Sequence, residues 1–371
     1  MPLPETPAAD WIDHRDTLQD WLAGLPADAA IGLDTEFMRR NTFYPQLALL
    51  QLGWNGRYAL LDPLAFEIGN CLQPLLGSGP AVTVMHSAGE DLETLAPLLP
   101  DGPATLFDTQ IAAAFVGMGL GISYRALVAE LIGVELDKGE TRSDWLQRPL
   151  TDSQRSYAVL DVVYLKRIHE QLAERLRQRG RSAWHAEDCA RLKARASHRD
   201  GDPQPQRAMR GAAEWSEARQ ARLRLLLQWR DRSARRFDVP RPWLLDDNLA
   251  MNLAQQPPAT LAELEQRCRG QRALRSAQRN DLFELLIKAI TAEDIAATAS
   301  IPAHPQGAAK QALAAMKQLV DARAAELDLP AGLLCPRKVL EEYAVTNEWP
   351  EFLDGWRREL LHDDLLKLLP S

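Results

Sequence analysis

The chain changes from mixed strand and helix patterns to helix patterns alone at a polar, proline-containing stretch near residues 201–208. Before this stretch, short apolar runs bounded by turn residues predict four buried strands, at residues 30–37, 47–54, 58–62 and 82–86. Asn55-Gly56 lies between the second and third runs and predicts a tight hairpin turn. Beyond the stretch no segment predicts a strand. These patterns predict an α/β domain, a sheet with flanking helices, followed by all-α helical domains.

Helical periodicity in the first half predicts helices at residues 89–99, 108–117, 123–132 and 151–179. The last of these opens with Thr151 and Gln154 in capping-box spacing. A second, weaker break, SIPAHPQG, lies at residues 300–307. A length of 371 residues fits two or three domains. We therefore predict domains at residues 1–205, 206–298 and 299–371.

The charge of the chain is unevenly distributed. A net charge of −8 argues against a nucleic-acid partner, because binding to phosphates depends on lysine and arginine. The segment from Arg207 to Arg241, however, contains ten arginines and four acidic residues. Such a basic segment indicates either a local nucleic-acid contact or a solvated helix face, and charge alone leaves both open.

Two acidic residues, Asp34 and Glu36, lie two positions apart in the first predicted strand, so their side chains leave the same face. A strand with Ile31, Leu33 and Phe37 around them seldom carries two acids on one face unless something compensates their charge. A metal ion is the simplest compensator. The alternative for this pair alone is that both acids project from an exposed strand end.

Two further acidic residues come from predicted helices. Asp91 lies in the first turn of the helix at 89–99, where carboxylates are common because they favour a helix N-terminus. Asp161 lies within the apolar stretch SYAVLDVVYL, a less ordinary place for an acid. Tyr157 is four residues earlier, so its ring lies on the same helix face as Asp161.

Four convergent carboxylates would repel one another and stay partly protonated unless cations bind them. Oxygen-only ligands suit Mg²⁺ or Mn²⁺ rather than Zn²⁺. A cluster of this kind can hold two divalent ions about 3.5–4 Å apart, an arrangement that promotes in-line phosphoryl displacement. A phenol with an ordinary pKa of about 10 suits the orientation of an attacking water better than the role of base at neutral pH. We assign that orienting role to Tyr157.

The order of these motifs, DTE, then HSAGEDLETL, then YxxxD, resembles the tyrosine branch of the DEDD exonuclease superfamily. The segments LFDTQIAAAF and KGETRSDWLQRPL resemble the ribonuclease D family within that branch, and the resemblance covers roughly residues 31–168. Carried over residue by residue, it implies that the metal ligands are Asp34, Glu36, Asp91 and Asp161. It also implies that Tyr157 orients the water. None of these five residues departs from the family pattern.

Residues 225–258 resemble an HRDC domain, a small helical module, on the basis of Trp229, Arg230, Arg241-Pro242, Asp246-Asp247 and Leu249. Residues 299–371 are assigned as a second, divergent copy from the family architecture and their helical pattern. The resemblance therefore implies a ribonuclease H-like exonuclease domain followed by HRDC-type domains. The implied activity is metal-dependent 3′→5′ exoribonuclease action that releases 5′-mononucleotides from RNA 3′ ends, with tRNA precursors as the expected substrate.

Candidate substrate contacts lie next to the motifs. Lys138, Arg142 and Arg148 are cations around Trp145, whose indole either stacks on a base or anchors the core. Phe37 and Tyr44 are candidate wedges for the terminal nucleotide, because they lie in or just after the strand that carries the acids.

Thr35, which lies between the two strand acids, is also a candidate contact. His86 lies five residues before Asp91 and mimics a histidine-type motif of related exonucleases. It ends a predicted strand, so a structural or supporting role is favoured over a ligand role. Asp108 suits the N-cap of the helix that follows it.

Other classes of function fit the sequence less well. No GxxxxGK[ST] phosphate loop occurs, which argues against a helicase. A DNA 3′→5′ exonuclease of the same superfamily stays open, because the motifs do not distinguish a 2′-hydroxyl. A non-catalytic nucleic-acid-binding helical protein is disfavoured by the five intact motif residues. Dispersed cysteines, an acidic N-terminus and the lack of any run of about 20 apolar residues predict a cytoplasmic protein without membrane contact. No protein partner can be inferred.

Overall fold

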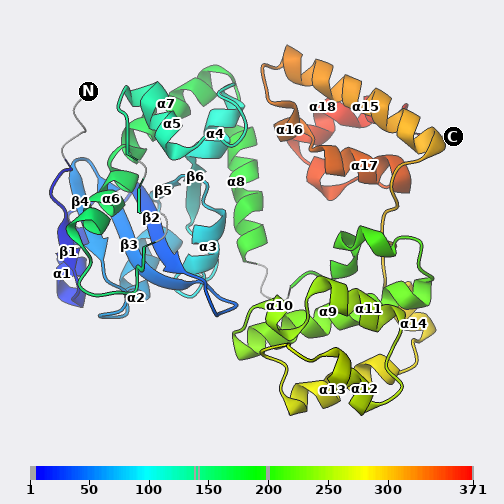
Figure 1. Cartoon of the computed structure of the whole chain (residues 1–371). Coiled ribbons are helices and arrows are strands. Elements are labelled where there is room, and N and C mark those ends of the chain that lie inside the picture. Colours follow the sequence, from blue (N-terminus) through cyan, green and yellow to red (C-terminus); the bar gives the residue numbers. More distant parts are fainter. Residues whose placement is uncertain (1–5, 138, 141–142, 198–200, 370–371) are drawn as a thin grey trace.

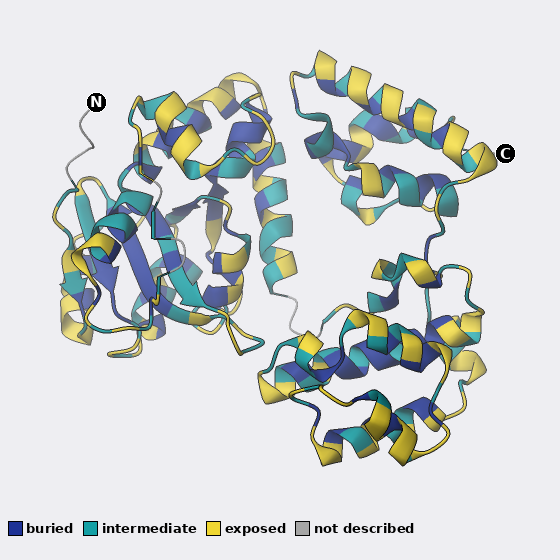
Figure 2. Ribbon diagram, in the orientation of Figure 1, coloured by how far each residue is buried: buried dark blue, intermediate teal, exposed yellow. Residues whose placement is uncertain are grey.

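The computed structural model describes residues 6–137, 139–140, 143–197 and 201–369 (Figure 1). An α/β unit that contains the sheet occupies the N-terminal half, and two groups of helices follow it. We call residues 206–298, which contain helices α9–α14, the first module, and residues 299–369, which contain helices α15–α18, the second module. Buried residues line the sheet and the inner faces of the helices (Figure 2). Among the described residues, no helix is long and apolar enough to cross a membrane.

The α/β unit is built on a mixed sheet of six strands in the order β1-β4-β3-β2-β5-β6. The strands are β1 (Asp10–Ile12), β2 (Ala30–Met38), β3 (Gln46–Trp54), β4 (Arg57–Leu61), β5 (Val82–Met85) and β6 (Thr105–Asp108). Strand β3 is antiparallel to both its neighbours, and the other pairs are parallel. The four predicted strands are confirmed, as is the turn at Asn55-Gly56, where both residues have positive φ. Strands β1 and β6 were not predicted. Strand β1 has only three residues, too few for an alternation to be recognised, and β6 directly precedes the helix predicted from residue 108.

Helices cover both faces of the sheet. Those of the α/β unit are α1 (Arg15–Ala23), α2 (Gly69–Leu72), α3 (Gly89–Leu95), α4 (Thr109–Phe115), α5 (Tyr124–Ile132), α6 (Asp152–Val163), α7 (Leu165–Gln178) and α8 (Ser182–Ala196), with a π-helical turn at Gln73–Gly77. Helices α6 and α7 pack on one face, where Gly32 and Gly53 admit the backbone of α6 at Val162. Helices α1 and α3 pack on the other face with part of α8.

The long helix predicted at 151–179 is wrong in one respect, because it is two helices that meet at Tyr164. No proline or glycine marks the break. Leu165 begins α7 and lies against Gly32 of the sheet, so tertiary packing, and not local sequence, turns the chain there. The start of the helix was predicted correctly, since Thr151 and Gln154 form the complete capping box.

The described part of the C-terminal half is entirely helical, as predicted. Its helices are α9 (Glu217–Phe237), α10 (Arg241–Leu244), α11 (Asp247–Gln255), α12 (Leu261–Arg267), α13 (Ser276–Ile287), α14 (Ala292–Ala296), α15 (Gly307–Glu326), α16 (Ala331–Leu334), α17 (Arg337–Thr346) and α18 (Trp356–Leu366). Short 3₁₀ turns lie at Pro205–Ala208, Arg210–Ala212 and Glu351–Leu353.

The two modules begin with the same series of elements. A helix of 21 or 20 residues ends near an aspartate with positive φ, Asp238 or Asp328. An apolar residue and a proline follow, then a four-residue helix, and then a helix of 9 or 10 residues. This shared series supports the prediction that residues 299–371 are a divergent copy of the first module.

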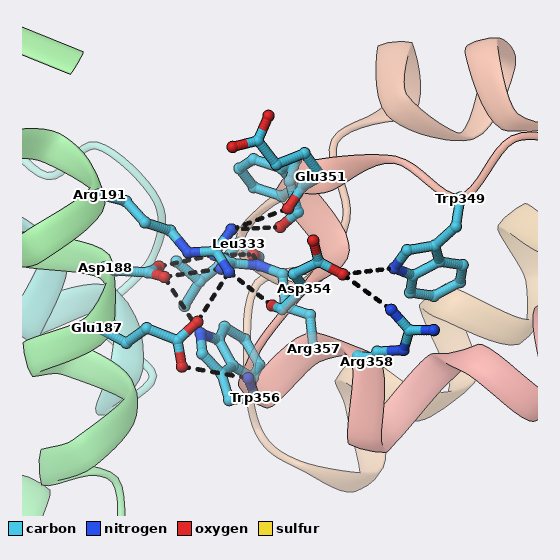
Figure 3. A network of polar contacts seen from close by, with 11 residues as sticks. Glu187, Asp188, Arg191, Leu333, Trp349, Glu351, Asp354, Trp356, Arg357 and Arg358 are labelled. Atoms are coloured by element: carbon cyan, nitrogen blue, oxygen red, sulfur yellow. Dashed lines mark hydrogen bonds and ion pairs between the residues drawn. The ribbon is translucent and has the colours of Figure 1, made fainter. Parts of the chain in front are cut away.

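The second module packs on α8 through the polar network of Figure 3. The Arg357 guanidinium binds both carboxylate oxygens of Asp188, with Nη1–Oδ1 at 2.7 Å and Nη2–Oδ2 at 2.6 Å. The Trp356 indole donates to Asp188 and stacks on Trp184 with ring centroids 4.7 Å apart. Arg357 is only 2% exposed, so this contact is a buried interface and not a surface encounter.

Smaller contacts also join the three parts. The backbone N–H groups of Phe43 and Tyr44 donate to Asp238 of the first module at 2.9 and 3.0 Å. Arg210, just before α9, pairs with Glu341 of the second module at 2.8 Å. Each of the three parts therefore contacts the other two.

Candidate active site

Strand β2 presents Asp34 and Glu36 on the face that α6 covers. Asp34 lies directly opposite Gln51 of β3, and Glu36 lies opposite Leu49. The register shifts between Glu36 and Phe37, and such a bulge re-aims the side chains beside it. Both acids are partly exposed, so they do not belong to the sealed core of the sheet.

Helix α6 brings Asp161 to the strand acids. One carboxylate oxygen from each of Asp34, Glu36 and Asp161 lies within 4.8 Å of the other two. Tyr157 lies one turn before Asp161 on α6, and its hydroxyl lowers the pKa of the neighbouring Asp161 carboxyl against the larger effect of burial. The structure thus brings together four of the five residues that the sequence motifs single out.

Asp91 approaches from the other side of β2. It lies in the first turn of α3, and Thr35 donates its hydroxyl to Asp91 Oδ1 at 2.5 Å. Asp91 is not part of the group of three oxygens within 4.8 Å, but its negative charge contributes to raising the pKa of both Asp34 and Glu36. Thr35 therefore ties Asp91 to the strand that carries the other acids.

Burial and mutual repulsion raise the pKa of every carboxyl in the cluster. The pKa of Asp34 is raised well above its ordinary value by burial and then by Asp91 and Asp161. Burial is also the main cause for Glu36, whose pKa rises to about 9, and for Asp161, whose pKa rises to about 7. Burial raises the pKa of Asp91 to about 6, against the hydrogen bond from Thr35. The ion-free cluster therefore tends to keep protons, because no cation among the described residues balances the charge of its carboxylates.

The residues present fit a divalent cation. Three partly exposed carboxylate oxygens lie close enough to share an ion, and no described Lys or Arg pairs with them. All donors are oxygens, which suits a hard cation such as Mg²⁺ or Mn²⁺. The raised pKa values show that ionisation of these carboxyls is unfavourable in the ion-free protein, and a bound cation would make it favourable.

Tyr157 is held between two neighbours that fix its ring. The indole of Trp145 lies on one side, with ring centroids 6.1 Å apart. The backbone of Gly139 lies against the ring, so closely that a Cβ at this position would overlap it. Glu140 anchors the same segment to α6 by accepting a hydrogen bond from Ser153 at 2.5 Å. Gly139 was missed by the sequence reasoning, and its glycine is required by space and not by a positive φ.

Several predicted substrate contacts have other partners in the structure. Trp145 is 3% exposed and packs with Leu150 and Ala158, so it acts as a core anchor and offers no open face to a base. The ring nitrogens of His86 contact Thr109 Oγ1 at 2.9 Å and the Ile122 carbonyl at 3.1 Å, which fits the favoured structural role.

The Thr35 hydroxyl donates a hydrogen bond to Asp91, as described above, so Thr35 supports a ligand and is not free to contact the substrate through this hydroxyl. Asp108 is the N-cap of α4, as predicted, and accepts from the N–H groups of Gln110 and Ile111. Tyr44 is 47% exposed and Phe37 is partly exposed, so both stay available as nucleotide contacts. Lys138 and Arg142 lie outside the described residues, and Arg148 pairs with Asp62 at 2.7 Å.

We expect the stabilisation by Mg²⁺ to grow as pH rises. The raised pKa values of Glu36 and Asp161 mean that the folded, ion-free protein keeps protons that the unfolded chain has released. Stability from these groups is fully present below about pH 4 and is lost as pH rises through about 7 and about 9. An ion replaces the protons, so the rise in Tm with Mg²⁺ over EDTA should increase from about pH 5 to about pH 9. A rise in Tm that is the same at every pH would contradict this.

The comparisons with known proteins agree with this geometry. The family model described as 3′-5′ exonuclease matches residues 9–177, and the HRDC domain model matches residues 219–286. The chain is 43% identical to ribonuclease D of Xanthomonas oryzae pv. oryzae, over 97% of this chain and 98% of that one. It is 31% identical to ribonuclease D of Escherichia coli strain K12, over 96% and 97%.

A solved structure of Escherichia coli RNase D, described as an exoribonuclease involved in structured RNA processing, superposes with a TM-score of 0.82. That likeness has 30% sequence identity and covers 97% of this chain and 98% of the other. The fold and the carboxylate cluster thus define a nuclease of the 3′-5′ exonuclease class with an HRDC domain behind it. More particularly, the chain belongs to the ribonuclease D family. It is a hydrolase, a metal-dependent 3′→5′ exoribonuclease.

Proposed function

We propose that this exoribonuclease releases 5′-mononucleotides from the 3′ ends of structured RNA, tRNA precursors among them, at a site that holds two Mg²⁺ or Mn²⁺ ions. The observation that carries the proposal is the meeting of Asp34, Glu36 and Asp161 at one partly exposed place, with Tyr157 one helix turn before Asp161. The description of the Escherichia coli relative as acting in structured RNA processing supports the choice of substrate.

We assign each residue a role that its position supports. Asp34, Glu36 and Asp161 would hold the ions directly, and Asp91 would complete the set from α3. When bound, the ions supply an activated water and stabilise the leaving oxygen. The Tyr157 hydroxyl orients the water for in-line attack, and burial keeps it protonated because it raises the phenol pKa. Trp145 and Gly139 hold the ring that carries this hydroxyl.

The helical modules would hold the RNA and not perform the chemistry. We propose domains at residues 1–205, 206–298 and 299–371, with the last two as HRDC-type modules. All the proposed ligands precede residue 205, and the densest arginine segment follows it. Some of these arginines are engaged in the protein, since Arg230 pairs with Asp247 and Arg235 pairs with Asp231. Arg207, Arg210 and Arg241 are also paired, with Glu342, Glu341 and Asp231. Arg219, Arg232 and Arg236 form no ion pair among the described residues and would be available for phosphates.

One assay tests the proposal as a whole. The full-length protein is incubated with 3′-structured RNA, and with DNA of the same sequence, each labelled at the 5′ end, in Mg²⁺, Mn²⁺ or EDTA. We expect a ladder of RNA products shortened from the 3′ end, release of 5′-mononucleotides, and no products in EDTA. Equal rates on DNA would favour the rival DNA exonuclease. Products in EDTA at the rate seen with Mg²⁺ would exclude the metal mechanism.

We predict that Tyr157→Phe keeps the affinity for Mn²⁺ and lowers kcat by about 100-fold, because it removes only the hydroxyl that orients the water. The ring that contacts Trp145 and Gly139 is retained, so the fold should not change. Single-turnover rates on labelled RNA and Mn²⁺ calorimetry measure the two effects. Tyr343→Phe, at a buried tyrosine in the second module, is the control. Wild-type rates from Tyr157→Phe would remove the hydroxyl from the mechanism.

A further inference from the structure

Gln51, in the middle of β3, is fully buried, and its side-chain amide forms no hydrogen bond with the described residues. It is 0% exposed, and neither Nε2 nor Oε1 has a hydrogen-bond partner among the described residues. Buried polar groups in folded proteins are nearly always paired, since an unpaired amide loses its hydration without compensation. An exception at this depth therefore calls for an explanation, which the neighbours of Gln51 provide.

The sheet register places Gln51 beside the carboxylate cluster. Gln51 lies directly opposite Asp34 on the antiparallel neighbour β2. Residues in this relation project from the same face of the sheet, with Cβ atoms about 4.5–5.5 Å apart. Gly53, two residues along and therefore on the same face, lies against Val162 of α6. The Gln51 amide is thus enclosed between the strand that carries Asp34 and the helix that carries Asp161.

Asp34 has no side-chain hydrogen-bond donor among the described residues, whereas Asp91 accepts a hydrogen bond from the Thr35 hydroxyl. The Tyr157 hydroxyl lowers the pKa of the neighbouring Asp161. The backbone N–H of Thr35 lowers the pKa of Asp34 in the same way. Carboxylates that bind metal ions usually accept an outer hydrogen bond that fixes their orientation. An amide donor and a carboxylate acceptor thus lie opposite one another without being joined.

We propose that Gln51 is a positioning residue for Asp34, and that its Nε2 donates to the Asp34 carboxylate when that carboxylate holds a divalent cation. This inference rests on the proposed role of Asp34 as a metal ligand. Gln51 then fixes the orientation of Asp34 from the side away from solvent, without itself touching the ion or the RNA. The unpaired amide destabilises the ion-free protein, and this stability is regained when the ion binds and the hydrogen bond forms.

The proposal makes a double prediction for Gln51→Met, a change that preserves length and removes both polar atoms. The affinity for Mn²⁺ should fall by about 10–100-fold, as is usual when the outer partner of a metal ligand is lost. The Tm of the ion-free protein in EDTA should rise, because an unsatisfied buried amide is replaced by an apolar side chain. A residue with a merely structural role would not weaken ion binding while stabilising the ion-free fold.

Thr83→Val is a matched control. Thr83 is also 0% exposed with an unpartnered hydroxyl, and it lies on β5, the other neighbour of β2. It pairs with Ile31, whose side chain leaves the face of β2 opposite to that of Asp34. Thr83→Val should therefore not lower the Tm in EDTA and should leave the Mn²⁺ affinity unchanged.

The experiment is calorimetric titration of the full-length variants with Mn²⁺, with thermal unfolding in EDTA. Gln51→Leu replaces Gln51→Met if the latter does not fold. An affinity within about two-fold of wild type for the folded variant would overturn the proposal. Asp34→Asn separates this failure from that of the proposed function. If Asp34→Asn loses Mn²⁺ and Gln51→Met does not, only the role of Gln51 is wrong. If Asp34→Asn binds Mn²⁺ normally, the ligand assignment itself fails.

Discussion

Replacing Asp34 by asparagine is expected to abolish turnover while leaving the protein folded. Asp34 lies at the centre of the cluster, within 4.8 Å, oxygen to oxygen, of both Glu36 and Asp161. An amide cannot supply the negative charge that holds the ions, and a loss of about 4 kcal/mol in transition-state stabilisation is about 1,000-fold in rate. Rates on labelled RNA with saturating Mg²⁺ measure this loss.

The same substitution should not lower the free energy of unfolding in EDTA. The neutral amide of the Asp34→Asn variant would not repel Glu36, Asp91 and Asp161, whose negative charges contribute to the raised pKa values in the cluster. Asp101→Asn is the control, because Asp101 is an exposed acid of the same α/β unit outside the cluster. A correctly folded Asp34→Asn protein that cleaves RNA at wild-type rates would disprove the role of Asp34.

Breaking the ion pair between Asp188 and Arg357 is expected to cost about 3–5 kcal/mol of stability, because it leaves one buried charge uncompensated. Arg357 is 2% exposed, packs between the rings of Phe352 and Trp356 at 4.3 Å from each, and donates to the Leu333 carbonyl. In Asp188→Ala its guanidinium keeps the rings and the carbonyl but loses its counter-ion. Urea unfolding followed by the fluorescence of the ten tryptophans, which include the stacked pair Trp184 and Trp356, measures this loss.

Two variants test the cause of this loss. Removing both charges, as in Asp188→Leu with Arg357→Met, should cost less than the sum of the single changes, since no unpaired charge remains. Arg358→Ala, at the next residue, breaks a pair with Asp354 in which both side chains are about half exposed, and should cost about 0–1 kcal/mol. Equal losses for Asp188→Ala and Arg358→Ala would show that burial of the pair has no energetic effect.

The sequence predicted the parts of the site that depend on local pattern. Asp34 and Glu36 could be placed on one strand face because a strand alternates, and Tyr157 and Asp161 on one helix face because a helix turns once in 3.6 residues. The capping box at Thr151 gave the start of that helix correctly. The motif resemblance then indicated which of these faces meet.

Contacts between segments far apart in the chain could not be predicted. Nothing local to Gly139 shows that its backbone lies on the ring of Tyr157, and nothing local to Gln51 shows that its amide is unpaired. Trp145 has the same local sequence whether it stacks on a base or fills a core, and only the packing of α6 on the sheet decides that it is buried. Arg357 likewise has the local sequence of an ordinary helix-surface arginine, because its pairing with Asp188 depends on the packing of the second module on α8.

Because each of the three parts contacts the other two, the loss of one contact does not separate any part from the rest. If Asp188 no longer binds Arg357, the second module is still tied by the chain to the first module and by Glu341 to Arg210. A short tether keeps a released surface at an effective concentration of millimolar order, so rebinding competes strongly with separation. Undocking at α8 is therefore expected to produce brief, reversible openings of one side of the molecule, and not its division into independent pieces.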